Sequence, residues 1–479
     1  MSTKAQQVNE EELTTGDSEL PEGWSLACLD ELCDPPQYGW TTSAKRDGQG
    51  LKLLRTTDIS SENVNWNQVP FCEDEPPEPA KYLLDPGDIV VSRAGSVGLS
   101  YMIRECPPTV FASYLIRFRP IKPVTSEFIS TFLKSPQYWF QIADETLGIA
   151  IPNVNGSKLR KLRVPLPPLV EQERICTSVR KALSGTNAVR RGLARTSSIL
   201  LNFRQAVLAA ACSGKLTEDW RERHSNVTPI QNYAVESDLP KTWYWSKLRD
   251  CAVLERGRFS IRPRNDPAYY GGKYPFVQIG DLPSDGGDIK EFHQTLNERG
   301  LAVSKMFLTG TVLVAIVGAT IGNTGVLTFD SCCPDSLIAI RGRSIMHSRF
   351  IEYYLRSKKL EIRDTSYASG GQPNINLQTL YPYPVPLAPD EEISVIVSRT
   401  EALFKLADAI EKRVAAASAR AEHLTQAVLA KAFRGELVPT EAELARKEGR
   451  EYEPASVLLE RIRAQKEITA AKQTKKKNR

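Results

Sequence analysis

The stretch Gln205-Ala206-Val207-Leu208-Ala209-Ala210-Ala211-Cys212-Ser213-Gly214-Lys215-Leu216 is the starting point, because the chain contains it twice. The second copy, Gln426-Ala427-Val428-Leu429-Ala430-Lys431-Ala432-Phe433-Arg434-Gly435-Glu436-Leu437, lies 221 residues further on, and eight of the twelve positions are identical. Repetition over this length predicts two tandem copies of one structural unit in the 479-residue chain.

The segment before each copy has the pattern of a long helix. In the second segment apolar residues recur in alternating steps of three and four, which is the spacing of a coiled-coil seam, and the positions 221 residues earlier repeat it. We therefore expect the two helices to pair through one stripe of residues: Val189, Leu193, Leu200, Phe203, Val207, Leu403, Ile410, Val414, Leu424 and Val428. Gly214 and Gly435 stand where a glycine commonly ends a helix.

The repeat also includes the regions before the helices. Leu20-Pro21-Glu22-Gly23-Trp24 returns as Leu239-Pro240-Lys241-Thr242-Trp243, and the exit Val164-Pro165-Leu166-Pro167-Pro168 returns as Val385-Pro386-Leu387-Ala388-Pro389. Each exit leads into an acidic helix start, which suits the positive end of the helix dipole. Between these anchors the two copies differ greatly, so we expect one scaffold that presents two different recognition surfaces.

The globular part of each repeat is predicted to be α+β, with a mainly antiparallel or mixed sheet. Ile89–Ser92 and Val312–Val317 are β-branched runs followed by glycine turns, and residues 128–139 and 350–362 have helical patterns. The predicted divisions are a disordered N-terminus (1–19), a globular domain (20–168), a central long helix (169–216), a linker (217–238), a second globular domain (239–389), a second long helix (390–437) and a C-terminal helical tail (438–479) without a counterpart in the first repeat.

Composition limits the possible classes of protein. Apolar residues make up 41% and charged residues 25%, as in an ordinary globular protein, and no apolar run approaches the ~20 residues that span a membrane. None of the nine cysteines forms a C-x-x-C pair and no signal peptide is visible, so we expect a cytoplasmic protein. The net charge of +5 permits a nucleic-acid partner.

Three short patterns resemble catalytic motifs, and each is better explained as a turn or a strand connection. Asp34-Pro35-Pro36-Gln37 lacks the aromatic fourth residue of an amino-methyltransferase, and Gly318–Gly325 has neither dinucleotide nor P-loop spacing. Asp288-Ile289-Lys290 lacks a partner acid on a neighbouring strand, which a metal-dependent nuclease would need. The sequence therefore predicts no catalytic, cofactor-binding or metal-binding residue.

A binding role has better support. Arg256, Arg258, Arg262 and Arg264 are interleaved with aromatic residues, and the first repeat has a cationic stretch at the same place. Charge runs are usually solvated, but recurrence at one scaffold position favours contact with phosphates and base edges. The residues predicted to bind DNA are Lys45, Arg46, Arg55, Arg93, Arg256, Arg258, Arg262, Arg264 and Lys273.

Taken together, these features resemble the specificity subunit of a type I restriction-modification system. The resemblance rests on the order of the motifs in both repeats, including Ile151-Pro152-Asn153 and Gln372-Pro373-Asn374 before the exits. It implies that each globular part is a target-recognition domain for one half of a split double-stranded DNA sequence, and that the helices form an antiparallel coiled coil. It also implies two methyltransferase subunits that bring S-adenosylmethionine to adenine, and restriction subunits that use ATP and Mg²⁺, with no cofactor in this chain.

Two alternatives stay open at this point. One is a self-sufficient methyltransferase or nuclease with two recognition domains, and the other is a structural dumbbell that binds proteins or polyanions without sequence preference. Geometry agrees with the DNA-reading hypothesis, because a heptad stretch of about 30 residues is ~45 Å long at 1.5 Å per residue. Half-sites one duplex turn apart are ~34–36 Å between centres.

Overall fold

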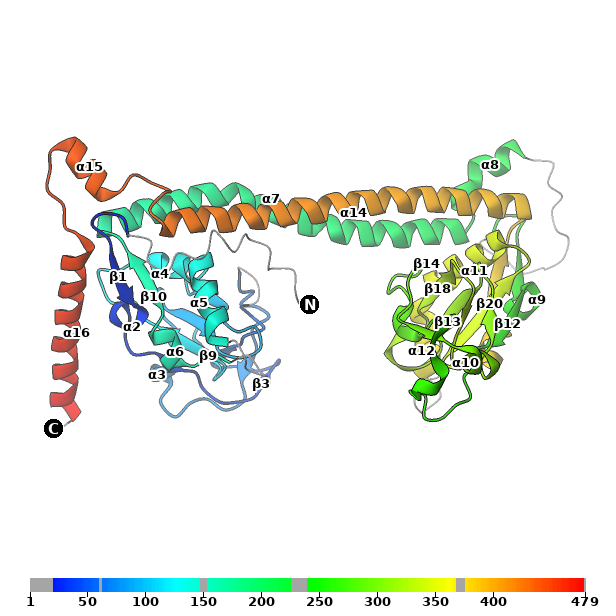
Figure 1. Cartoon of the computed structure of the whole chain (residues 1–479), viewed down its shortest axis with the longest axis horizontal. Helices are drawn as coiled ribbons and strands as arrows, with labels where there is room; N and C mark the ends of the chain where they lie inside the picture. The colour runs from blue at the N-terminus through cyan, green and yellow to red at the C-terminus, as the bar shows by residue number, and fades with distance from the viewer. Residues whose placement is uncertain (1–19, 60–62, 147–152, 225–238, 368–374, 478–479) are drawn as a thin grey trace. The chain divides into compact units, whose positions relative to one another are not determined.

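Contacts within the chain divide it into two units. The computed structural model describes residues 20–59, 63–146, 153–224, 239–367 and 375–477. Unit 1 comprises Met1–Gly192 and Ala417–Arg479, and unit 2 comprises Leu193–Ala416. Figure 1 draws the long helices α7 (Leu169–Cys212) and α14 (Asp390–Phe433). Each of these helices is divided between the two units.

Some predicted features lie outside the described residues. They are the N-terminus (1–19), the linker from residue 225 to 238, Ile151-Pro152 and Gln372–Asn374 of the two Pro-Asn motifs, and Asn478-Arg479.

Unit 1 is a mixed α+β body with three small sheets. Its strands are β1 (Ser25–Cys28), β2 (Gln37–Tyr38), β3 (Ala44–Lys45), β4 (Lys52–Leu54), β5 (Phe71–Cys72), β6 (Ile89–Ser92), β7 (Ser100–Met102), β8 (Thr109–Phe111), β9 (Leu115–Phe118) and β10 (Arg163–Leu166). Its helices besides the long ones are α2 (Leu29–Leu32), α3 (Pro79–Tyr82), α4 (Ser126–Phe132), α5 (Pro136–Thr146), α6 (Gly156–Arg160), α15 (Glu441–Glu448) and α16 (Ala455–Lys477). The sheet orders are β2-β9-β6-β7, β3-β5-β4-β8 and β1-β10, and among the described strands of unit 1 only β4 and β8 pair in parallel.

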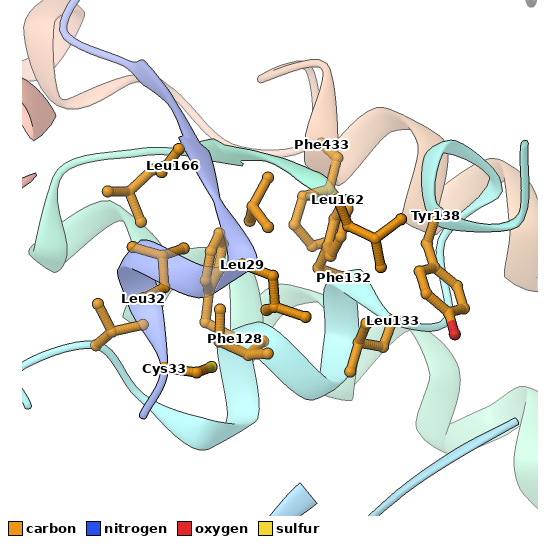
Figure 2. Close-up of a cluster of buried hydrophobic side chains, with 14 of the residues drawn as sticks. Leu29, Leu32, Cys33, Phe128, Phe132, Leu133, Tyr138, Leu162, Leu166 and Phe433 are labelled. Carbon is orange, nitrogen blue, oxygen red and sulfur yellow. The ribbon is translucent and has the colours of Figure 1, made fainter. Parts of the chain in front are cut away.

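The main core of unit 1 joins segments that are far apart in sequence. Phe128 and Phe132 of α4 contact Phe433, the last residue of α14, with ring centroids 5.5 and 5.4 Å apart (Figure 2). Leu458 and Ile462 of α16 are fully buried in the same core. The second half of α14 and the C-terminal tail therefore complete the hydrophobic core of the first globular part.

Unit 2 has the same kind of construction with a larger central sheet. Its strands are β11 (Tyr244–Lys247), β12 (Ala252–Arg256), β13 (Tyr270–Phe276), β14 (Asp288–Ile289), β15 (Gln294–Leu296), β16 (Met306–Phe307), β17 (Val312–Ala315), β18 (Thr324–Leu327), β19 (Ser331–Cys332), β20 (Leu337–Gly342) and β21 (Pro384–Leu387). Its shorter helices are α8 (Glu218–Arg223), α9 (Leu248–Cys251), α10 (Glu298–Ala302), α11 (Ile345–Ser357), α12 (Lys359–Tyr367) and α13 (Leu377–Leu380). The sheet orders are β12-β20-β17-β18-β14, β15-β13-β19-β16 and β11-β21.

The centre of each main sheet is a fully buried strand, β6 in unit 1 and β17 in unit 2. Both pair antiparallel with the strand that precedes the helix layer, so that Ile89 lies opposite Phe118 and Val312 lies opposite Ile340. Buried β-branched residues on a central strand satisfy both the sheet ladder and the core. The α+β fold with mixed sheets that the sequence predicts is confirmed.

The repeated glycine ends each long helix and contacts the repeated proline. Gly214 and Gly435 have φ angles of +78° and +75°, a left-handed conformation that favours glycine after a helix. A Cβ atom on Gly214 would lie 2.5 Å from Cγ of Pro240, and one on Gly435 would lie 2.4 Å from Cγ of Pro21. The glycine therefore permits both the turn and the close contact with the start of a globular part.

A buried tryptophan–glutamate hydrogen bond occurs once in each unit. Nε1 of Trp24 donates to Oε1 of Glu171, and Nε1 of Trp243 donates to Oε2 of Glu392, both at 2.9 Å. The two carboxylates are fully buried in the first turns of α7 and α14. The acidic helix starts thus do more than face the helix dipole, because they hold each globular part to its helix.

The free oxygen of each carboxylate binds a short helix that follows the repeated motif. Oε2 of Glu171 accepts a hydrogen bond from the backbone nitrogen of Glu441 in α15 at 2.8 Å. Oε1 of Glu392 accepts one from Oγ1 of Thr217, just before α8, at 2.7 Å. The prediction that the C-terminal tail lacks a counterpart was therefore wrong for α15, since α8 occupies the same position. A two-residue insertion, Val438-Pro439, obscures this equivalence in the sequence.

The buried stripe of the long helices differs from the predicted seam at two positions. Val189 and Leu424 are 52% and 53% exposed, whereas Thr186 and Thr425 are 7% and 9% exposed. The predicted seam alternates between steps of three and four residues. On α14 the next buried residues after Ala421 are Thr425 and Leu429, which follow in two steps of four. A straight helix drifts relative to a strict heptad, so the buried face moves off the predicted residues. The prediction that Val189 and Leu424 face the partner helix is not supported.

The other predicted seam residues are buried or half-buried. Leu200 and Val207 are 8% and 6% exposed. The half-buried positions are Leu193, Phe203, Leu403, Ile410, Val414 and Val428. The helix α7 continues through Ser184–Asn187 without a break, although Gly185 lies there.

Candidate nucleic-acid interface

The two cationic stretches begin at the same backbone position of the scaffold. The backbone nitrogen of Gly39 donates to the carbonyl of Leu115 at 3.2 Å, and that of Gly257 donates to the carbonyl of Leu337 at 2.9 Å. A Cβ atom on Gly39 would lie 2.2 Å from a backbone oxygen, and one on Gly257 would lie 2.1 Å from another. Only glycine fits this approach, so the side chains on either side of it are held at fixed places.

The residues that flank the glycines are different in the two units. Tyr38 and Trp40 in unit 1 correspond to Arg256 and Arg258 in unit 2, because the neighbouring backbone hydrogen bonds match as well. We call the group formed by Tyr38, Trp40 and Arg93 the unit 1 platform. The group formed by Arg256, Arg258, Arg262, Arg264 and Asp335 is the unit 2 platform.

In the unit 2 platform, the arginines gather around one carboxylate. Asp335 lies 2.5 Å from Nη2 of Arg264 and 3.5 Å from Nη2 of Arg262. The backbone oxygen of Asp335 also accepts a hydrogen bond from Nε of Arg256 at 2.7 Å. All three arginines are exposed, so guanidinium groups are concentrated on one small area of surface.

The remaining arginine and its aromatic neighbour anchor the loop. Nη2 of Arg258 donates to the carbonyl of Ser304 at 2.7 Å. Phe259 is 2% exposed, and its ring centroid lies 5.7 Å from that of Tyr270 and 5.2 Å from that of Phe276. The interleaved Phe259 therefore packs in a small core of unit 2, and is not available to stack on a base.

Lys273 lies apart from the arginines on β13. Its side chain is 74% exposed, with Nζ 3.2 Å from Glu298 and 5.1 Å from the ring centre of Tyr274. Hydrogen bonds from Tyr274 and Lys273 lower the pKa of Glu298, so this carboxylate stays charged beside the lysine.

In unit 1 the predicted cationic residues are distributed over two sheets. Lys45 and Arg46 are exposed at the end of β3. Arg55 is half-buried, and its Nε and Nη2 atoms bind both oxygens of Asp58 at 3.0 and 2.8 Å. This bidentate pair raises the pKa of Arg55 and occupies one of the two edges through which the guanidinium could recognise a base.

Arg93 belongs to the unit 1 platform. Its guanidinium carbon lies 5.1 Å from the ring centre of Tyr38, and its Nε atom is buried without a hydrogen-bond partner in the described part of the chain. The hydroxyl of Tyr38 accepts a hydrogen bond from the backbone nitrogen of Gly156 at 2.8 Å, which fixes the ring. Tyr114, adjacent through a backbone hydrogen bond to Arg93, is 60% exposed. A cation held over an aromatic ring is thus the main feature here.

The structure gives the three motif-like patterns structural roles. The side-chain amide of Gln37 donates to the carbonyl of Lys81 at 2.7 Å, and Gly318–Thr320 forms a short 3-10 turn between β17 and β18. Asp288 forms an ion pair with Arg349. Among the residues that the structure describes, no group of three or more His, Cys, Asp or Glu side chains is arranged to hold a metal ion. No described helix is long and apolar enough to cross a membrane.

A model of the type I restriction modification DNA specificity domain matches residues 21–191 and again 240–417. The chain belongs to this DNA specificity family. Its two matches coincide with the two globular parts and the first portion of each long helix, so both halves of the chain are specificity domains.

Full-length relatives of the DNA specificity family agree with this. The chain is 28% identical to the type I restriction enzyme EcoKI specificity subunit of Escherichia coli strain K12, over 96% of this chain and 98% of the relative. It is 29% identical to the EcoDI specificity subunit of Escherichia coli, over 90% of this chain and 96% of the relative. The resemblance drawn from the sequence is confirmed, and the chain is a DNA-recognition subunit of a type I restriction-modification system.

A solved structure shares the fold of this chain. It comes from work titled "Structural basis underlying complex assembly and conformational transition of the type I R-M system". It aligns with a TM-score of 0.62 and 21% identity, over 88% of this chain and all of that chain.

Two functional features escaped the sequence analysis. Asp335 comes 71 residues after Arg264, and only the pairing of β12 with β20 brings them together. No local pattern could have indicated it. The Trp–Glu pairs did leave a signal, because Trp24, Trp243, Glu171 and Glu392 all recur at nearly the repeat spacing.

Proposed function

We propose that this specificity subunit is non-catalytic and reads a bipartite DNA target, with one platform on each half-site. The observation that carries the proposal is the shared glycine position, Gly39 and Gly257, from which two chemically different sets of side chains project. One backbone position that both units share, with different side chains around it, suits two readers of different base sequences.

The contacts to DNA are proposed for the cationic residues predicted from the sequence. Exposure of Lys45, Arg46, Arg256, Arg262 and Arg264 supports this role. Arg258 is exposed as well, whereas Arg55 supports the role less directly, because it is half-buried and already binds both oxygens of Asp58. Arg93 and Lys273 contribute positive charge beside aromatic rings.

We also propose that α7 and α14 form an antiparallel coiled coil that separates the readers. In unit 1, Arg190 of α7 lies 3.7 Å from Glu422 of α14. In unit 2, Arg204 of α7 lies 2.6 Å from Asp408 and 2.9 Å from Glu411 of α14. The later residue of α7 pairs with the earlier residues of α14, which supports opposite directions for the two helices.

The catalytic steps are assigned to partner subunits. Two methyltransferase subunits would dock on this chain and carry the S-adenosylmethionine that methylates adenine, and restriction subunits attached through them would use ATP and Mg²⁺. The specificity subunits among the relatives support this assignment. The nine cysteines are free thiols, most of them buried, which agrees with a reducing compartment such as the cytoplasm.

The proposal is tested by selecting duplexes from a randomised pool with the purified chain, alone and with its methyltransferase partners. We expect enrichment of two short motifs at a constant spacing. Incubation with labelled S-adenosylmethionine and the selected duplex should transfer methyl groups only when the partners are present. Transfer by the chain alone would establish a self-sufficient methyltransferase, and equal binding of all duplexes would establish a polyanion-binding dumbbell.

The coiled-coil part has its own test. Insertion of four residues in the exposed part of α7 near Arg195 lengthens one helix by roughly 6 Å at 1.5 Å per residue. The spacing between the two selected motifs should change, while the motifs themselves should not. A constant spacing contradicts the role of the helices as spacers.

A further inference from the structure

Asp335 occupies the turn between β19 and β20 and faces the arginine-rich loop of unit 2. Its side chain is 32% exposed, so it lies at the edge of the surface rather than in the core. Three arginines approach this one residue, two through its carboxylate and one through its backbone oxygen. A carboxylate among these arginines repels phosphate, so its presence indicates a role other than general attraction to DNA.

The carboxylate restricts the arginine side chains. Oδ1 of Asp335 accepts a hydrogen bond from Nη2 of Arg264, and the hydroxyl of Tyr270 donates to the backbone oxygen of the same arginine. Nη1 of Arg262 binds the carbonyls of Phe259 and Ile261 at 3.0 and 2.8 Å. The guanidinium is a planar fork, so holding one nitrogen fixes the direction of the other donors.

The equivalent turn of unit 1 lacks this device. The backbone oxygen of Tyr114 accepts a hydrogen bond from the backbone nitrogen of Arg93, and the backbone oxygen of Ser336 accepts one from the backbone nitrogen of Ile316. Tyr114 and Ser336 are therefore equivalent, and the residues before them, Ser113 and Asp335, correspond to each other. The residues that correspond to Arg256 and Arg258 are Tyr38 and Trp40. The carboxylate is therefore found in the platform that also carries the arginine cluster.

We propose that Asp335 is a specificity-determining positioning residue for the DNA half-site read by unit 2. It holds Arg264 and Arg262 so that their free N–H groups meet a pair of acceptors on one base edge, as N7 and O6 of guanine provide. Its negative charge disfavours the alternative in which these arginines contact phosphates. The inference rests on the proposed function, because it presupposes that unit 2 reads a half-site.

The test uses the full chain with its methyltransferase partners and a pool of randomised duplexes. Asp335→Asn keeps the size of the side chain and removes its charge. We expect the base preference in one half-site to fall about tenfold, because one oriented bidentate contact is lost. The other half-site should keep its preference, and affinity for random duplex should stay the same or rise.

Two further variants sharpen the result. Arg264→Lys keeps the charge but lacks the fork, so it should reduce preference in the same half-site as Asp335→Asn. Asp285→Asn removes the same charge from an exposed loop of unit 2 and should leave both half-sites unchanged.

The outcomes separate the hypotheses. Unchanged preference with Asp335→Asn overturns the positioning role, as does an equal loss in both half-sites, which would mean a general structural defect. If the wild-type complex itself enriches no bipartite sequence, the proposed function fails before Asp335 is tested.

Discussion

The platforms of units 1 and 2 share one backbone arrangement, but their arginines are held by different chemical groups. In unit 1, Arg93 lies over the fixed ring of Tyr38, so a cation is supported by an aromatic face. In unit 2, Arg262 and Arg264 are supported by the carboxylate of Asp335. The scaffold therefore determines where side chains project, while a few substitutions determine what they can recognise. The two units share a frame, which is their buried cores and helix ends, and they differ in their exposed platforms. Substitutions in the frame should have larger effects than substitutions in the platforms.

The largest expected effect is on stability, and it concerns the place where each long helix ends in the core of its unit. Phe433 and Cys212 occupy the same place in the repeated motif, but Phe433 contacts two aromatic rings of unit 1. Phe433→Ala should lower the free energy of unfolding by about 4 kcal/mol, because it removes a large buried side chain. Cys212→Ala, the matched control, should cost about 1 kcal/mol. Urea denaturation measures both, and equal costs would mean that the two helix ends are packed alike.

The next largest effect concerns the buried carboxylates. Glu392→Ala should cost about 3 kcal/mol, because it leaves Trp243, Thr217 and Arg221 without their shared acceptor. Glu171→Ala should cost less, because no arginine loses its ion-pair partner in this variant. The nearby Arg174 and Arg450 bind Glu441 instead of Glu171. Thermal unfolding of the two variants compares them. A larger loss for Glu171→Ala would contradict this ranking.

A third prediction separates the two surfaces. Replacement of Arg256, Arg258, Arg262 and Arg264 by alanine should weaken binding to duplex DNA about a hundredfold near 0.1 M salt and flatten its salt dependence, because fewer counterions are released. Replacement of both Lys45 and Arg46 by alanine should weaken DNA binding less, because two positive charges are lost instead of four. Fluorescence anisotropy over a range of salt concentrations provides the measurement. An unchanged salt slope for the fourfold variant would place the loop away from the duplex.

The smallest expected effect is a dependence on pH in unit 2. Asp58 and Asp281 make the same backbone contact in the two units, but Asp58 binds Arg55 whereas Asp281 binds His293. The hydrogen bond from His293 to Asp281, with help from Glu291, raises the pKa of His293. The stabilisation should be complete below the ordinary histidine pKa of about 6.5 and lost as pH rises through the raised value. Because His293 is exposed, the change should be small.

Nuclear magnetic resonance titration of His293 measures this effect directly. Asp281→Asn should return the pKa of His293 toward its ordinary value, and Arg55 in unit 1 should stay charged throughout. An unshifted His293 in the wild-type chain would show that the pair does not form in solution.

Much of the frame could be predicted from the sequence, because it depends on local patterns that occur twice. The buried strands at Ile89 and Val312, the helix-ending glycines and the entry prolines all leave signals within a few residues. The exposure of Leu424 could not be predicted from a heptad pattern, since the buried stripe of α14 shifts after Ala421. The exposure of Val189 on α7 could not be predicted from that pattern either.

The platform chemistry was only partly accessible. The arginines of unit 2 were identified, but the burial of Phe259 and the position of Asp335 depend on strand pairings between segments far apart in sequence. In unit 1, nothing in the sequence around Arg55 distinguishes an arginine bound to Asp58 from one available to a ligand. Side-chain partners outside a regular repeat require the fold to be known.

The discontinuity of unit 1 has a consequence for biosynthesis. The hydrophobic surface around Phe128 and Phe132 is covered by residues of α14 and α16 that the ribosome makes after unit 2. At about 5–20 residues per second, the nascent first half must wait roughly ten to sixty seconds for these segments. Unit 2, whose residues are contiguous, can finish folding in the meantime, so the part that is translated first is the last to mature.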